Sequence, residues 1–191
     1  MPFWSSGQVE PKRQFRFTVI IGNMAEGATF YARSVTKPAF TVTTSNHKFL
    51  NHTFYYPGKV EWNEVTLSLV DPVDPDATGN VLTILRKSGY NVPANLADPD
   101  ATSTIGKKAA SDALGEVTIE ALDEDGTPLE QWKLNNPFIT GITMNDYSYE
   151  GEELSTVDIS LRYDWASYII PSDRTISTGG PDFVDPRLFT L

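Results

Sequence analysis

Apolar and polar residues alternate with a period of two in most parts of this chain that show a hydrophobic pattern. This alternation is typical of a β-strand with one buried face. It predicts strands at residues 15–21, 28–34, 62–69, 117–121, 129–134, 138–144 and 157–163. The chain is therefore expected to be mainly β, as a sandwich or barrel of antiparallel strands.

Two pairs of these segments are close enough in sequence to form hairpins. Asp123 to Gly126 is a typical turn between residues 117–121 and 129–134. Gly22 to Gly27 separates the first two segments in the same way. We expect a hairpin at each place.

One flanking helix is expected, at residues 75–88. Asp74 and Pro75 suit the N-cap and first helical position, and Val81, Leu82 and Leu85 have helical spacing. After this helix, residues 90–114 are rich in Pro, Ala, Asp, Ser, Lys and Gly, and we expect a loop insertion there.

Two stretches lack a sustained period, residues 40–56 and the end of the chain from Ala166. Long segments without a core of their own are uncommon in compact domains unless they have a function. We expect both to contact other subunits. The predicted division is an N-terminal arm (1–12), a β domain (13–168, with the insertion at about 90–114) and an irregular C-terminal arm (169–191).

The chain of 191 residues is acidic, with a net charge of −10. Residues 1–70 hold seven Lys or Arg and four Asp or Glu, whereas residues 120–158 hold ten Asp or Glu and the single Lys133. Binding to duplex DNA needs clustered cations. Stable nucleic-acid binding is therefore not expected, but passage of DNA is compatible with this composition. Opposite charges in the two regions could also steer head-to-tail stacking.

Neither an enzyme nor a cofactor-binding protein is expected. The chain has no cysteine and two histidines, His47 and His52, which an extended segment would place on opposite faces. No nucleophile elbow, phosphate-binding loop or zinc-protease motif is present. Asp74, Asp76 and Gly79 only partly match a calcium loop, and Glu150, Glu152 and Glu153 are more simply surface carboxylates.

No segment approaches the roughly 18 apolar residues of a membrane span. The first residues lack the basic-then-apolar order of a signal peptide. We therefore expect neither a membrane partner nor export through the Sec pathway.

The order of the segments resembles the tail-tube proteins of contractile phages. The resemblance is carried by FRFTVII, FYARSVTKPAFTV, a Tyr-Pro-Gly turn and WNEVTLSL, and then by GEVTIEALDEDGTPLEQWKLNNPFITGITMNDYSYEGEELSTVDISLRYDWASY. Related tubes occur in phage-tail-like bacteriocins and in type VI secretion. The resemblance covers residues 13–168. The insertion at 90–114 and the C-terminal arm depart from the family pattern.

The resemblance implies a structural protein of the virion tail, assembled in the host cytoplasm. Copies of the chain would form hexameric rings that stack into a tube, with the tail sheath, baseplate and tape-measure proteins as partners. DNA would pass through the tube without specific binding. A neutral or acidic channel wall would avoid holding the DNA, and Glu120, Glu130 and Asp158 are candidate channel-lining residues.

Two other functions fit the same sequence. The chain could be the tube of a bacteriocin-like or type VI-like injection device that carries no DNA. It could instead be a monomeric β-sandwich binding module that uses Trp62, Trp132 or Tyr147 as a stacking platform. A monomer would distinguish the module from both tubes.

Overall fold

The structure is a computed structural model that describes residues 11–24, 32–91 and 103–170. Residues 1–10 of the expected N-terminal arm and 171–191 of the expected C-terminal arm lie outside these ranges. The described chain contains the following elements: β1 (Phe17–Ile21), β2 (Ala32–Val35), β3 (Phe40–Phe49), β4 (His52–Trp62), β5 (Val65–Val70), α1 (Ala77–Lys87), α2 (Lys107–Leu114), β6 (Val117–Leu122), β7 (Pro128–Asn135), β8 (Phe138–Met144), β9 (Thr156–Arg162) and β10 (Trp165–Ile169). The expected mainly β fold is confirmed.

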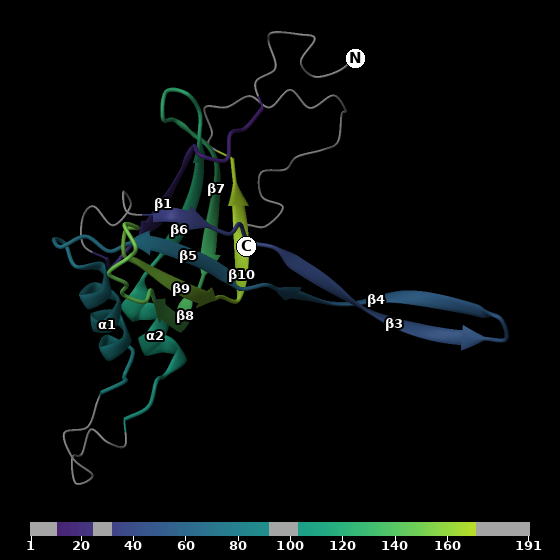
Figure 1. Ribbon diagram of the computed structural model, residues 1–191. Helices are drawn as coiled ribbons and strands as arrows, with labels where there is room; N and C mark the ends of the chain where they lie inside the picture. Colours follow the sequence, from purple (N-terminus) through teal and green to yellow (C-terminus); the bar gives the residue numbers. More distant parts are fainter. Residues whose placement is uncertain (1–10, 25–31, 92–102, 171–191) are drawn as a thin grey trace.

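Two four-stranded antiparallel sheets form the body of the protein. Sheet A has the order β1-β6-β7-β10, and sheet B has the order β2-β5-β9-β8. Their strands run in crossed directions (Figure 1). Among the described residues the two sheets do not join into a closed barrel, so the sandwich is the correct one of the two expected architectures.

One hydrophobic core joins the two sheets and both helices. Sheet A contributes Val19, Val117, Ile119, Leu134 and Ala166. Sheet B contributes Val65, Leu67, Leu69, Val157, Ile159 and Leu161, and the helices contribute Val81, Ile84, Ala113 and Leu114. These strand positions have the period of two seen in the sequence, because alternate side chains of a strand point to the same face.

Helix α1 begins at Ala77, two residues later than predicted. The side chain of Asp76 is its N-cap and accepts a hydrogen bond from the backbone N–H of Gly79 at 2.9 Å. Asp71 accepts further bonds from the N–H groups of Ala77 and Thr78. Two carboxylates therefore satisfy the free N–H groups of the first turn, and neither is the predicted cap Asp74.

The buried face of α1 also differs from the prediction. Ala77, Val81 and Ile84 are buried, whereas Leu82 is exposed. The helix therefore packs through positions 77, 81 and 84, which lie four and three residues apart on one face.

A second helix, α2, lies within the region predicted to be a loop. Its buried residues Ala110, Ala113 and Leu114 have helical spacing, and Gly115 follows it at a positive φ of 77°. The prediction of one helix is therefore wrong, as is the prediction of a loop for residues 107–114. Residues 92–102 of the same region lie outside the described residues.

Strand pairing confirms one expected hairpin and overturns the other. β6 and β7 pair as predicted. β1 pairs instead with β6, and β2 pairs with β5 in the other sheet. The first strand starts at Phe17, where its pairing with β6 begins, and Phe15 before it is 76% exposed. Residues 28–31 of the second predicted strand lie outside the described residues.

The third and last predicted strands are also revised. Trp62 ends β4, and a new strand begins at Val65, so the predicted strand 62–69 is interrupted. β8 and β9 form close to the predicted positions. At the end of the described chain, Trp165–Ile169 is not irregular but forms β10, which pairs with β7 at the edge of sheet A.

Candidate assembly surfaces

Strands β3 and β4 form a long hairpin that projects from the body (Figure 1). We call this hairpin the arm. All ten residues of β3 and the first ten of β4 are exposed. At about 3.3 Å per residue, β3 alone spans about 30 Å. The stretch without a period at residues 40–56 is thus regular structure that has no buried face within the described part of its own subunit.

A β-bulge near the middle of the arm depends on Gly58. The register shifts between Val42 and Thr44, and the Thr43 hydroxyl accepts a hydrogen bond from the N–H of Lys59 at 2.9 Å. A Cβ at Gly58 would lie 2.5 Å from Thr43 Oγ1 and 2.9 Å from the Thr43 carbonyl oxygen. Only glycine fits this close approach of the two strands.

The distal half of the arm has two chemically different faces. His47 pairs with Phe54, Phe49 pairs with His52, and Ser45 pairs with Tyr56. Because alternate residues of a strand share a face, these six side chains lie together, and we call them the histidine face. The other face carries Asn46 with Tyr55 and Lys48 with Thr53.

The two histidines therefore share a face, contrary to the sequence expectation. The expectation assumed one continuous extended segment. Leu50 and Asn51 instead turn the chain between the strands, and Leu50 has a positive φ of 51°. The described residues contain no group of three or more side chains suited to hold a metal ion.

Aromatic contacts fix the root of the arm to the core. The rings of Phe40 and Trp62 meet edge to face, with centroids 5.3 Å apart. Trp62 then contacts Tyr163, at 5.9 Å. Burial raises the pKa of the Tyr163 hydroxyl, against smaller opposing effects of the Ala39 backbone and Arg162. The base of the arm is held by the sandwich, while its distal half is free to reach a partner.

Residues 71–76 and 144–154 lie at the other end of β5 from the arm. The arm leads into Val65, the first residue of β5, and Val70, the last, leads into residues 71–76. Val70 pairs with Thr156, and the N–H of Asp71 donates to the carbonyl of Ser155 at 2.9 Å. Both segments therefore leave the same end of sheet B. We call residues 71–76 and 144–154 the loop surface.

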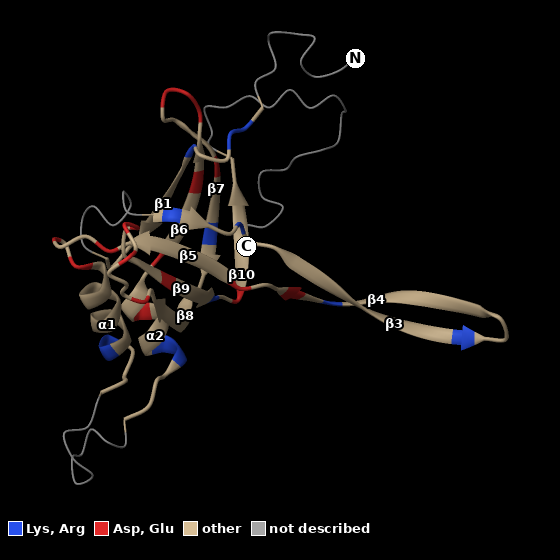
Figure 2. Ribbon diagram, viewed as in Figure 1, with Lys and Arg blue, Asp and Glu red and all other residues tan. Residues whose placement is uncertain are grey.

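The loop surface combines exposed apolar and acidic side chains. Its exposed large hydrophobic residues are Val73, Met144, Tyr147, Tyr149 and Leu154. Its exposed carboxylates are Asp74, Asp76, Asp146, Glu150, Glu152 and Glu153. Figure 2 shows these acidic segments at the left of the molecule, and the arm, with a blue segment near its tip, extending to the right.

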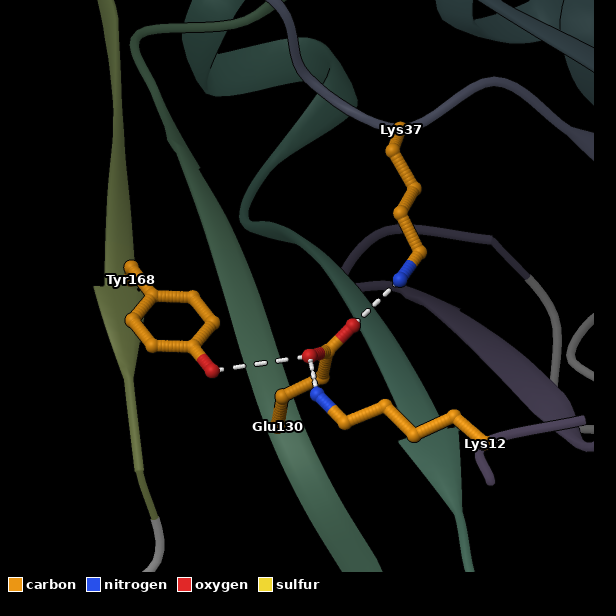
Figure 3. A network of polar contacts seen from close by, with 4 residues as sticks. All are labelled: Lys12, Lys37, Glu130 and Tyr168. Carbon is orange, nitrogen blue, oxygen red and sulfur yellow. Dashed lines mark hydrogen bonds and ion pairs between the residues drawn. The ribbon is translucent and has the colours of Figure 1, made fainter. Parts of the chain in front are cut away.

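Near the root of the arm, Glu130 joins three separate parts of the chain. Its carboxylate accepts hydrogen bonds from Lys12, which precedes β1, and from Lys37, which precedes the arm. The hydroxyl of Tyr168 on β10 donates to it at 3.4 Å (Figure 3). Burial opposes ionisation, but the hydrogen bonds and charges of the two lysines outweigh it, so the pKa of Glu130 is lowered.

The three predicted channel-lining residues do not share a surface. Glu120 alternates with the core residue Ile119, so it lies on the outer face of sheet A, where Gln131 Nε2 donates to it at 2.6 Å. Asp158 alternates with Val157 and Ile159 on β9 and lies on the outer face of sheet B. Glu130 lies on the opposite face of sheet A from Glu120, because it pairs with Ala121.

The aromatic residues considered as a binding platform are also dispersed. Trp62 and Trp132 pack against the hydrophobic core, and Trp132 contacts Tyr168 with ring centroids 4.9 Å apart. Tyr147 is 93% exposed on the loop surface. The three side chains do not form one platform.

Sequence reasoning missed the histidine face and the ion pairs of Glu130. A hairpin signal would have required a recognised turn at Leu50-Asn51, which contains no glycine or proline. Lys12, Lys37 and Glu130 lie up to 118 positions apart, and no local pattern connects them. The acidic loop surface, in contrast, was partly visible as the excess of carboxylates in residues 120–158.

Solved structures of contractile injection systems contain chains with this fold. A chain of the PVC sheath-tube complex of an extracellular contractile injection system, in the extended state, has a TM-score of 0.61 and 17% sequence identity. The similarity covers 84% of this chain and 93% of that chain. A chain of the anti-feeding prophage baseplate has a TM-score of 0.59 and 15% identity. That similarity covers 84% of this chain and 97% of the baseplate chain.

The tube-terminating cap of the anti-feeding prophage also contains a chain with this fold. One of its chains has a TM-score of 0.58 and 18% identity, with 90% of this chain and all of that chain covered. No protein-family model and no curated protein sequence matches the chain. The resemblance to proteins of contractile tails is therefore confirmed at the level of the fold.

Proposed function

We propose that this chain is a tube subunit of a contractile injection apparatus and functions by self-assembly, without catalysis. Copies would form rings, six to a ring by the resemblance, and the rings would stack into a tube within a sheath. The observation that carries the proposal is a fold shared over nearly the full length of chains from a sheath-tube complex and a tube-terminating cap. The exposed arm supports it, because a two-stranded hairpin is at best marginally stable alone in water.

Assembly of the purified chain tests this function. We expect rings and stacked tubes in electron micrographs at high protein concentration, and large species in analytical ultracentrifugation. Replacing residues 45–56 by a two-residue turn should leave a folded body that no longer stacks. A compact monomer at every concentration would contradict the proposal and favour a binding module.

In a more specific form of this proposal, the tube belongs to a phage tail in the virion and conducts DNA. The acidic balance of the chain supports this form, since a channel without clustered cations would not retain a polyanion. Sheath, baseplate and tape-measure proteins would then be its partners. Of the proposed channel carboxylates Glu120, Glu130 and Asp158, a channel wall formed by one face of one sheet would expose only one, because the three lie on different faces.

The second candidate is a tube of an injection device that carries no DNA. The observation in its favour is that the similar chains come from extracellular contractile injection systems. Genes adjacent to the one that encodes this chain would distinguish the two forms. Capsid genes indicate a phage tail, and their absence beside other injection-system genes indicates the second candidate.

A further inference from the structure

We propose that the histidine face of the arm binds the loop surface of a second copy of this chain. The inference rests on the proposed function and goes further, because it names the two surfaces and the chemistry that joins successive subunits. The contact is heterologous, meaning that it joins two different surfaces. Each subunit therefore uses its arm on one neighbour and its loop surface on another, and the pairing can repeat without limit.

The first argument is the apolar content of both surfaces. Phe49, Phe54 and Tyr56 on the histidine face are each at least half exposed. Tyr147, Tyr149 and Leu154 on the loop surface are more than two-thirds exposed. Soluble monomers rarely expose contiguous apolar patches of large side chains, and such patches mark interaction sites. Burying one patch against the other removes both from water.

The second argument is charge complementarity. The arm carries two cations, Lys48 and Lys59, and one carboxylate, Glu61, near its root. The loop surface carries six exposed carboxylates and no Lys or Arg. Charges around an apolar centre steer association and select the partner. Lys48 lies on the other face of the arm, so its side chain would meet the carboxylates only at the edge of the contact.

The third argument is placement. The arm leaves the Val65 end of β5 and the loop surface leaves the Val70 end, so the two surfaces face away from each other on one subunit. An arm about 30 Å long cannot fold back onto its own loop surface without breaking the strands that anchor its root. The contact is therefore between copies.

Adjacent aromatic residues on opposite faces of the arm give a matched test. Phe54→Ser removes an aromatic side chain from the histidine face, and Tyr55→Ser removes one from the other face. On the loop surface, Tyr147→Ser with Tyr149→Ser is compared with Tyr90→Ser, which replaces an exposed tyrosine elsewhere. Circular dichroism and thermal unfolding check that every variant folds.

We expect Phe54→Ser and the double loop variant to weaken self-association about tenfold or more, as is typical of central aromatic interface residues. Tyr55→Ser and Tyr90→Ser should associate like the wild type. A mixture of the arm variant and the loop variant should associate more strongly than either variant alone, because the intact arm of one can bind the intact loop surface of the other.

The possible failures are distinguishable. A wild-type chain that stays monomeric overturns the proposed function and this inference with it. Wild-type polymers together with equal association of all variants overturn the inference alone. Loss of association for Tyr55→Ser but not for Phe54→Ser would show that the arm binds through the face opposite the histidine face. A mixture that associates no more strongly than either variant alone would show that the two surfaces do not meet.

Discussion

The backbone N–H of Asp71 donates a hydrogen bond to the carbonyl oxygen of Ser155 at 2.9 Å. This bond extends the pairing of β5 and β9 by one step beyond Val70 and Thr156. It therefore fixes the point at which both segments of the loop surface leave the sandwich. The same Asp71 uses its carboxylate to bind the first turn of α1.

Asp71→Ala should destabilise the protein by about 1–2 kcal/mol, because the variant loses the bonds to two helix N–H groups and to the Thr78 hydroxyl. Asp74→Ala, in the same loop but exposed, is the matched control and should change stability by less than about 0.5 kcal/mol. Urea unfolding measures both free energies. Equal effects would contradict the assignment of Asp71 as a helix cap.

Gly58→Ala should distort the arm without unfolding the body, because the added Cβ would collide with the backbone of Thr43. We expect a nearly unchanged melting temperature and reduced assembly. Gly141→Ala in β8 is the control, since a Cβ there would meet Ser160 at 3.7 Å, an ordinary contact. Assembly as efficient for Gly58→Ala as for Gly141→Ala would show that the bulge is not needed.

Glu130→Gln should destabilise the protein at neutral pH by about 1–3 kcal/mol, because Lys12 and Lys37 lose a charged acceptor. The pKa of Glu130 is lowered in the fold, so its contribution is complete above the ordinary glutamate pKa of about 4.3. It is lost as the pH falls through the lowered value.

Unfolding free energies measured between pH 7 and pH 3 check this dependence. The difference between wild type and Glu130→Gln should shrink only below about pH 4. Glu150→Gln, at an exposed position of the loop surface, is the control and should follow the wild-type curve. A difference that does not vary with pH would exclude the ion pairs as its cause.

Channel lining can be tested with Glu120→Lys and Asp158→Lys. The two carboxylates lie on the outer faces of different sheets, so a channel lined by one sheet should expose only one of them. In the phage form of the proposed function, in which the tube conducts DNA, one substitution should slow DNA release from assembled particles, because added cations bind phosphates. The other should leave release unchanged. Release at the wild-type rate from both sets of particles would contradict an acidic channel wall.

For Glu120, which is buried, a folding control is needed. Glu120→Gln keeps the shape of the side chain and removes its charge. If the Lys variant alone fails to assemble, the defect comes from burying a cation. Release is then compared between wild type and the Gln variant, which should release DNA at the same rate because it adds no cation.

The sequence by itself determined the elements whose pattern repeats over neighbouring residues. β6 and β7 were predictable because Val117 and Ile119 alternate with polar residues and a turn follows within a few positions. β8 and β9 were predictable from the same alternation. Local alternation records which face of a strand is buried, and that information is present in any short window of sequence.

Only the tertiary structure decided which strands pair and where each surface lies. β1 pairs with β6 although about a hundred residues separate them, and Glu130 forms ion pairs with Lys12 and Lys37 from distant segments. The arm showed no period because neither of its faces is buried within the described part of one subunit, so nothing forces apolar residues into alternate positions. His47 and His52 share a face only because the chain turns between them. Such relationships depend on long-range packing, which no short stretch of sequence encodes.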